Sequence, residues 1–333
     1  MTATTPTAAA TRVRRLARED LDAVVSIDAA IVGRTRRAYF ERRLAAALRQ
    51  PEVHVQFALE EDGAFRGHVL GRVLEGEFGR TRTALRLEVI SVDPKASSRG
   101  LGRALHAAIE AEARKRGISE LRTASSWRDH AMLRFLSAMG YQLAPALIAE
   151  CAVQGGRQFD RPVEAPESAG DPNDYGAQAA NDFEALPRDK IDVRLLTLKD
   201  LDEVARIDRN VTGRNRADYM RRALEEALRD SAIRVSLAGR LDGMLAGFIM
   251  ARADLGDFGR AEPVAIIDTL GVDPGYRGMG IGHALLSQLF VNLSALRIER
   301  VETVLAHDST DLIGFFRAAG FVQGQRLGFY KPL

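Results

Sequence analysis

The sequence predicts an α/β protein made of two tandem copies of one domain, each a mixed central sheet flanked by helices. Three observations predict this class. The chain has 333 residues, more than a single hydrophobic core usually spans. Its second half repeats the first without a gap at an offset of 180 residues, which sets Val193 over Val13. Strand-like and helix-like apolar periods alternate along each copy.

The composition excludes several classes of protein. With 46% apolar and 28% charged residues, the chain is typical of globular domains. A net charge of +2 is too small to attract nucleic acid without strong clustering. No apolar run reaches the roughly 20 residues that span a bilayer, so we expect no membrane partner. A single cysteine, Cys151, allows no internal disulfide and fits a reducing, cytoplasmic location.

The repeat divides the chain into four segments. Residues 1–11 are predicted to be a disordered tail, and residues 12–152 and 191–333 to be the two domains. The intervening residues 153–190 are rich in Gly, Pro, Asp and Ala and predict a linker. We expect the two domains to pack as an internal pseudo-dimer, as duplicated domains can.

Local signals give the order of elements in the second copy. Thr197 and Asp200 form a T-x-x-D signal for the start of a helix. Asp242 and Gly243 predict a tight hairpin turn. The predicted order is a strand at 191–198, helices at 201–211 and 216–230, strands at 233–240, 244–254 and 263–272, a helix at 282–296, a strand at 300–306, a helix at 310–320, and one or two last strands ending near Tyr330.

A glycine-rich loop follows the apolar strand in each copy, as "VDPGYRGMGIGHALL" at 272–286 and "VDPKASSRGLGRALH" at 92–106. Gly278, Gly280 and Gly282 allow the backbone to turn its N–H groups inward. The helix that follows adds unpaired N–H groups and a partial positive charge. Arg277 can supply a cation to a phosphate oxygen. Together these features predict a site for a pyrophosphate.

Other interpretations of the loop are weaker. A dinucleotide fingerprint G-x-G-x-x-G fails, because His283 or Leu285 stands where the third glycine belongs. A Walker loop fails because neither copy contains G-K-[ST]. A glycine-rich turn without a ligand remains as an alternative.

The motif R-x-x-G-x-G after "VDP" and a central strand resembles motif A of the Gcn5-related N-acetyltransferase (GNAT) superfamily, and "FFRAAGF" at 315–321 resembles a later part of that fold. The resemblance covers both copies and implies two tandem GNAT-like domains that use acetyl-CoA. It implies that the pantetheine arm pairs with Leu270, Gly271 and Val272. It also implies that the pyrophosphate is held by Arg277, Gly278, Met279, Gly280, Ile281 and Gly282.

The first copy departs from this motif at one position. Ser97 stands where the second copy has Arg277, so its phosphate loop is degenerate and we expect cofactor chiefly at the second domain. Arg99, two residues later, is a candidate replacement cation. The corresponding cofactor residues of the first copy are Ile90, Ser91, Val92, Arg99, Gly100, Leu101 and Gly102.

Acyl transfer to an amine requires a neutral nucleophile, whereas an amine of pKa about 10 is mostly protonated at pH 7. The resemblance implies a carboxylate base on the central strand, which is Asp268 in the second copy and Glu88 in the first. Apolar surroundings should raise the pKa of such a carboxylate, and a salt bridge at the strand end is the alternative. The tyrosine that the family often uses as general acid is replaced by Leu136 and Phe316.

The leading hypothesis is an N-acetyltransferase that moves an acetyl group from acetyl-CoA to a primary amine. The alternative is a non-catalytic acyl-CoA-binding or sensing protein. An arginine-rich surface on the first two helices of each copy is a candidate acceptor wall, with Arg214 and Tyr219 as substrate residues; solvated helix faces are the alternative. The six histidines are scattered, so we expect no metal site.

Overall fold

The computed structural model describes most of the chain, and the predicted tail and linker lie almost entirely outside the described residues. The repeated motifs at 76–80 and 256–260 lie outside them as well. The described residues are 10–74, 82–97, 99–153, 191–229, 235–254 and 264–333.

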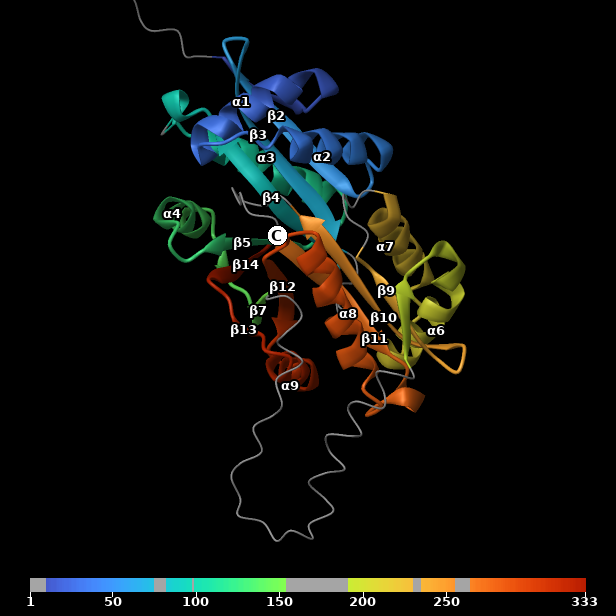
Figure 1. The fold of residues 1–333 in the computed structure, drawn as a ribbon. Helices are drawn as coiled ribbons and strands as arrows, with labels where there is room; N and C mark the ends of the chain where they lie inside the picture. The colour runs from blue at the N-terminus through green and yellow to red at the C-terminus, as the bar shows by residue number, and fades with distance from the viewer. Residues whose placement is uncertain (1–9, 75–81, 98, 154–190, 230–234, 255–263) are drawn as a thin grey trace, which may run out of the picture.

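Two seven-stranded mixed sheets form the framework, each built mainly from one repeat (Figure 1). The first repeat forms β1 (Thr11–Arg15), α1 (Leu21–Val32), α2 (Arg37–Arg49), β2 (His54–Glu61), β3 (Ala64–Leu74), β4 (Ala84–Val92), α3 (Leu101–Lys115), β5 (Glu120–Ser126), α4 (His130–Ala138), β6 (Gln142–Leu143) and β7 (Ala146–Ala152). The second repeat forms β8 (Asp192–Leu195), α6 (Leu201–Thr212), α7 (Ala217–Arg229), β9 (Leu237–Leu241), β10 (Met244–Asp254), β11 (Val264–Val272), α8 (Ile281–Ala295), β12 (Arg300–Ala306), α9 (Thr310–Ala318), β13 (Val322–Gln323) and β14 (Arg326–Pro332). This order confirms the predicted α/β class and the predicted succession of elements.

Local signals act as predicted. The Thr197 hydroxyl and N–H both donate to the Asp200 carboxylate, at 2.7 and 2.9 Å, just before α6. Asp242 and Gly243 join β9 to β10 with φ values of +50° and +80°. A two-residue hairpin turn of this kind requires positive φ at both central residues, which explains the Asp-Gly pair.

Helices cover both faces of each sheet. In the first sheet, Phe40 of α2 packs with Leu70 and Val89 on one face, and Leu105 and Ile109 of α3 pack on the other. The second sheet is arranged in the same way, with α6 and α7 on one face and α8 on the other. The central strands β4 and β11 are therefore buried on both sides, as the apolar run at 263–272 predicts.

The two repeats exchange their last long strands. β14 pairs antiparallel with β5, from Arg326↔Ser126 to Pro332↔Glu120, and so belongs to the first sheet. β7 pairs antiparallel with β12 and belongs to the second sheet. Figure 1 shows the green β7 beside the β12 of the other repeat. The repeats therefore pack as an internal pseudo-dimer, and sheet membership does not follow the repeat boundaries at 152 and 191.

The exchange predicts a long-range effect of Phe329, which belongs to β14 but is buried in the core beneath α3. Phe329→Ala is expected to lower the free energy of unfolding by about 3–5 kcal/mol, because it removes a buried ring. Hydrogen exchange should become faster first in β5, in the other repeat. As a control, Tyr330→Phe removes only an exposed hydrogen bond to Gln142 and should cost about 1 kcal/mol or less. Loss of protection confined to β11 and β12 would contradict the exchange.

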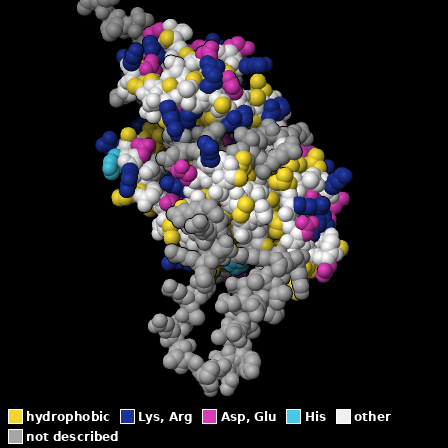
Figure 2. All heavy atoms as spheres, in the orientation of Figure 1, with side chains coloured by type: hydrophobic (Ala, Val, Ile, Leu, Met, Phe, Trp, Pro, Cys, Tyr) yellow, Lys and Arg dark blue, Asp and Glu magenta, His cyan; other side chains and the backbone are white. Residues whose placement is uncertain are grey.

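The described residues bear on three sequence expectations: charge distribution, helix length and the grouping of possible metal ligands. Acidic and basic side chains are interspersed on the face seen in Figure 2. None of the described helices combines the length and apolar character needed to cross a bilayer. Among the described residues, no three or more His, Cys, Asp or Glu side chains are grouped so that they could hold a metal ion.

Candidate functional site

The glycine loop of the second repeat forms a cradle of backbone N–H groups between β11 and α8. Gly278 and Gly280 have φ values of +78° and +77°, a region in which a side chain is strained. The first N–H that bonds back along α8 is that of Ala284, to the Gly280 carbonyl at 2.9 Å. The N–H groups of Ile281, Gly282 and His283 precede it, have no acceptor within α8 and lie at the positive end of the helix, whereas the Met279 N–H donates to the Tyr276 carbonyl at 3.4 Å. This geometry suits a pyrophosphate.

Arg277 and Gly282, both predicted to hold the pyrophosphate, have different surroundings in the structure. Arg277 is exposed and forms no ion pair with any residue that the structure describes. It is thus available to a phosphate at the rim of the loop. At Gly282, by contrast, a Cβ atom would lie 2.9 Å from Cε2 of Phe315. Gly282 therefore also allows α8 to approach α9 closely, a role that the loop motif does not reveal.

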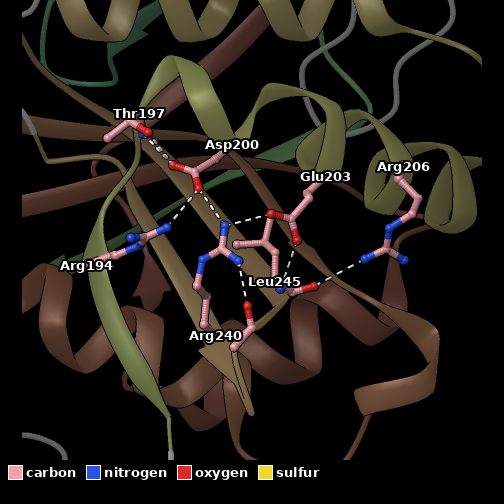
Figure 3. Close-up of polar contacts among 8 residues, drawn as sticks. Arg194, Thr197, Asp200, Glu203, Arg206, Arg240 and Leu245 are labelled. Carbon is pink, nitrogen blue, oxygen red and sulfur yellow. Dashed lines mark hydrogen bonds and ion pairs between the residues drawn. The ribbon is translucent and has the colours of Figure 1, made fainter.

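Asp273 and Arg206 anchor the start of the loop. The Asp273 carboxylate accepts a hydrogen bond from the Gly275 N–H at 3.0 Å, and it pairs with Arg206 of α6. The Gly275 hydrogen bond, followed by the one from Arg206, lowers the pKa of Asp273. Arg206 also donates to the Leu245 carbonyl at 3.3 Å (Figure 3). One side chain thus connects α6, the hairpin and the loop.

A polar network fixes α6 itself against the hairpin (Figure 3). Asp200 is buried and accepts from Arg240 at 2.8 Å and from Arg194 at 3.2 Å. Arg240 also donates to Glu203 at 2.7 Å, and Glu203 accepts the Leu245 N–H at 3.1 Å. The helix that carries Arg206 is therefore held rigidly in place.

The central strand of each sheet separates from its parallel neighbour. β11 pairs with β12 only from Val264↔Arg300 to Ile267↔Thr303, although β10 continues to pair along its other edge. β4 likewise pairs with β5 only at Leu85 and Arg86. The strand edge beyond the split is free of its parallel neighbour and can accept an extended, amide-bearing chain. The predicted pantetheine residues lie on these stretches: Leu270, Gly271 and Val272, and in the first repeat Ile90, Ser91 and Val92.

The two candidate bases occupy equivalent β-bulges at the split. Met250 lies opposite Thr269 and Ala251 opposite Ile267, which leaves Asp268 as the extra residue of β11. The same shift between β3 and β4 leaves Glu88 as the extra residue of β4. A bulge bends its strand and changes the direction of a side chain. Both carboxylates are therefore placed where the parallel strands part.

Glu88 is sealed in an ion pair. Its side chain is 5% exposed, and its Oε2 lies 2.6 Å from Nε of Arg43, which also donates to the Gly71 carbonyl. Burial by itself would raise the pKa of Glu88, but the positive charges of Arg43 and Arg86 lower it to about 2. The predicted raised pKa is therefore wrong for Glu88, and the salt-bridge interpretation holds. The reason is that α2 places a guanidinium directly over β4.

Asp268 also forms an ion pair, as the salt-bridge alternative predicts, but it is more exposed than Glu88. Its side chain is 29% exposed, and its Oδ2 lies 2.9 Å from Nε of Arg252 on β10. It lines a cavity of about 120 Å³ between the two sheets, which Glu88 does not reach. The charged side chains of this cavity come from both repeats: Arg86, Arg122, Asp268, Glu302 and Arg326.

The loop of the first repeat keeps the backbone but not the side chains of its counterpart. Gly100 has a φ of +80° and precedes α3, which begins with Leu101 and Gly102. The Ser97 hydroxyl donates to the Pro94 carbonyl at 3.0 Å. Arg99, the candidate replacement cation, pairs with Glu61 of β2 at 3.1 Å. Its guanidinium is directed toward β2 within its own repeat.

The predicted acceptor wall is only partly available. Arg216 donates to buried Asp208 at 2.9 Å, and Arg36 makes the same contact with Asp28 at 2.8 Å. Both arginines belong to the arginine-rich surface predicted as a candidate acceptor wall, and the structure instead pairs each with a buried aspartate of the preceding helix. Arg214 is exposed after α6, and Tyr219 is partly buried with the Arg216 guanidinium 5.1 Å from its ring centre. The structure does not bring Arg214 or Tyr219 to the cavity that Asp268 lines.

Sequence reasoning missed the other charged residues of the cavity. Arg86, Arg122 and Glu302 each interrupt an otherwise β-prone strand, and Arg86 precedes Glu88 by two positions, on the same face. A charged residue within a buried β-strand is the signal in the sequence that could have identified these three residues. Only the exchange of strands shows that the residues of both repeats line one cavity.

The fold and the site together define a duplicated α/β domain in which a split central strand leads into a glycine-rich loop at the start of a helix. The model of the "Acetyltransferase (GNAT) family" matches residues 16–141 and 201–321. The chain belongs to this family, as two tandem domains.

Solved structures share the fold over nearly the whole chain. A "Tandem GNAT protein from the clavulanic acid biosynthesis pathway" is 18% identical with a TM-score of 0.61, covering 97% of this chain and 98% of that one. A GCN5-related N-acetyltransferase from Sphaerobacter thermophilus is 15% identical with a TM-score of 0.56, covering 97% and 95%. A glucosamine N-acetyltransferase region of a fungal β-N-acetylglucosaminidase is 15% identical with a TM-score of 0.61, covering 97% and 38%. No curated protein matches the sequence significantly.

Proposed function

We propose that the second repeat is an acetyl-CoA-dependent N-acetyltransferase that acts on a primary amine. One observation carries the proposal. Asp268 stands at the bulge where β11 leaves β12, partly exposed on a cavity, whereas its counterpart Glu88 is sealed by Arg43. The free strand edge and the cradle with Arg277 then lie on the path expected for the pantetheine arm and the pyrophosphate.

The residues suggest how the reaction proceeds. Asp268 accepts the proton of the acceptor ammonium, directly or through one water molecule, and the neutral amine attacks the thioester carbonyl. A C–N bond forms, the C–S bond breaks and the sulfur leaves as thiolate, while the attacking nitrogen loses its excess proton to water. Leu136 and Phe316 are buried at the positions of the expected tyrosine and cannot donate a proton. A thiol of pKa about 8.5 is a good enough leaving group to depart without one.

The first repeat serves, in this proposal, as a structural partner. It contributes β7 to the second sheet and walls to the cavity. The absence of a tyrosine at Leu136 and Phe316 favours a second candidate, a non-catalytic acyl-CoA-binding protein.

The full-length protein tests the two candidates directly. We expect acetyl-CoA and a panel of amino acids, amino sugars, polyamines and lysine peptides to release free thiol with at least one amine, above the rate without amine. Calorimetry reports cofactor binding in parallel. Tight acetyl-CoA binding without thiol release on any amine would contradict the enzyme and support the second candidate.

A further inference from the structure

We infer that Thr303 is a positioning residue for Asp268, because its hydroxyl holds the peptide group that directly precedes this carboxylate. The inference deepens the proposed function and rests on it, since Asp268 is the proposed base.

A threonine hydroxyl closes the parallel ladder at the point where β11 leaves β12. Thr303 of β12 donates from its hydroxyl to the Ile267 carbonyl of β11, and 3.2 Å separates the two oxygens. Ile267 and Thr303 are also the last residues of these two strands that pair with each other. Thr303 is fully buried, and a buried carbonyl requires a donor. At the end of this ladder, a side chain provides one.

This hydrogen bond acts on Asp268 through the peptide plane. The Ile267 carbonyl and the Asp268 N–H belong to one planar unit, which ends at the Asp268 Cα atom. Asp268 is the extra residue of a bulge, where the regular pairing with β10 is interrupted and restrains the chain less. The Thr303 hydroxyl therefore restrains the backbone just before the carboxylate, from the opposite edge of β11.

The first repeat contains the same arrangement. Thr123 of β5 donates to the Leu87 carbonyl at 3.0 Å, directly before Glu88. The residues beside the two threonines differ, since they are Arg and Ala in β5 but Glu and Val in β12. Valine has nearly the same shape and a similar preference for strands, so the hydroxyl is what distinguishes threonine at this place. Thr123 thus provides a matched control, because it precedes a carboxylate that takes no part in the proposed reaction.

Isosteric substitution in the full-length protein tests the inference. Thr303→Val should lower kcat by about 10- to 100-fold, because misplacing a reacting group by about 1 Å has an effect of this order. Acetyl-CoA affinity should change by less than about threefold, since the loop that holds the pyrophosphate is untouched. Thr303→Ser keeps the hydroxyl and should retain kcat within about threefold. Thr123→Val should lower Tm by as much as Thr303→Val does, but keep kcat within about twofold.

A double-mutant cycle shows whether Thr303 acts through Asp268. In an Asp268→Asn background, Thr303→Val should change kcat by less than about threefold, because the group that it positions is already gone. The full loss of about 10- to 100-fold in that background would overturn the inference, since a merely structural threonine affects both backgrounds equally. Equal losses of kcat in Thr303→Val and Thr123→Val would overturn it as well.

Hydrogen exchange separates this inference from the proposed function. Amide exchange over residues 266–270 should become about tenfold faster in Thr303→Val, whether or not any amine is acetylated. Faster exchange there, in a protein whose wild type releases no thiol with any amine, would support the positioning role and refute the enzyme. Unchanged exchange over these residues, or wild-type kcat in Thr303→Val, would overturn the positioning role and leave the enzyme standing.

Discussion

Replacing Gly280 with glutamate is expected to weaken acetyl-CoA binding at the second repeat by about 10³-fold. Gly280 has a φ of +77° immediately before α8, so any side chain there is strained by about 1–2 kcal/mol. The new carboxylate would also stand beside the N–H cradle and repel the pyrophosphate, a like-charge contact that costs several kcal/mol. Calorimetric titration of the full-length variant with acetyl-CoA measures the effect.

The first repeat offers a matched control. Gly100 has a φ of +80° before α3, so Gly100→Glu imposes the same strain and the same charge on the other loop. We expect the acetyl-CoA affinity of this variant, measured by the same titration, to stay within about twofold of the wild type, since Ser97 stands where the second loop has Arg277, the arginine proposed to bind phosphate. Equal losses in both variants would refute the ranking of the loops. Unchanged affinity in Gly280→Glu would remove the second loop from the cofactor site.

Replacing Asp268 with asparagine is expected to lower kcat by about 10²–10⁴-fold, the usual contribution of a general base. The amide has nearly the same size, so acetyl-CoA affinity should not change. Without the base, the reaction depends on amine that is already neutral, so the rate of the variant should rise with pH toward the amine pKa of about 10. Stopped-flow detection of thiol release across pH 6–10 measures both effects. Full turnover near neutral pH would exclude Asp268 as the base.

Glu88→Gln is the control for this experiment. It leaves Arg43 buried without its charge partner, which should lower the free energy of unfolding by about 3–5 kcal/mol. Turnover per folded molecule should not change. Because the pKa of Glu88 is about 2 when folded and 4.5 ordinarily, its contribution is present at neutral pH and declines as the pH falls from 4.5 toward 2. An inactive, folded Glu88→Gln protein would assign catalysis to the first repeat instead.

Much of the fold and the backbone of the glycine loops follow from residues close together in the chain. The Asp242–Gly243 turn, the Thr197–Asp200 cap and the loop glycines are fixed by backbone preferences that act over a few positions. The duplication supports these predictions further, because the same residue pattern occurs in both repeats. The turn and the helix start could therefore be predicted without the tertiary structure, whereas cofactor binding by the loop stays a prediction.

The strand exchange and the environments of the two carboxylates could not be predicted in this way. An alternating strand such as β14 can complete either sheet, and it pairs with β5 some 200 positions earlier in the chain, as Arg326↔Ser126 shows. Asp268 and Glu88 occupy equivalent bulge positions, yet the ion-pair partner of each carboxylate comes from another helix or strand. Arg43 reaches Glu88 from α2 across 45 positions, and its positive charge, together with that of Arg86, outweighs the effect of burial on the pKa of Glu88.

The sequence by itself determined the duplicated α/β architecture, the two glycine loops and the difference between Arg277 and Ser97, because each is encoded in local residue patterns. Only the tertiary structure decided which carboxylate is sealed, which one faces a cavity, and that both repeats line this cavity. Those properties depend on contacts between residues far apart in the chain. They are the ion pairs Arg43–Glu88 and Arg252–Asp268, and the pairing of β7 with β12 and of β14 with β5.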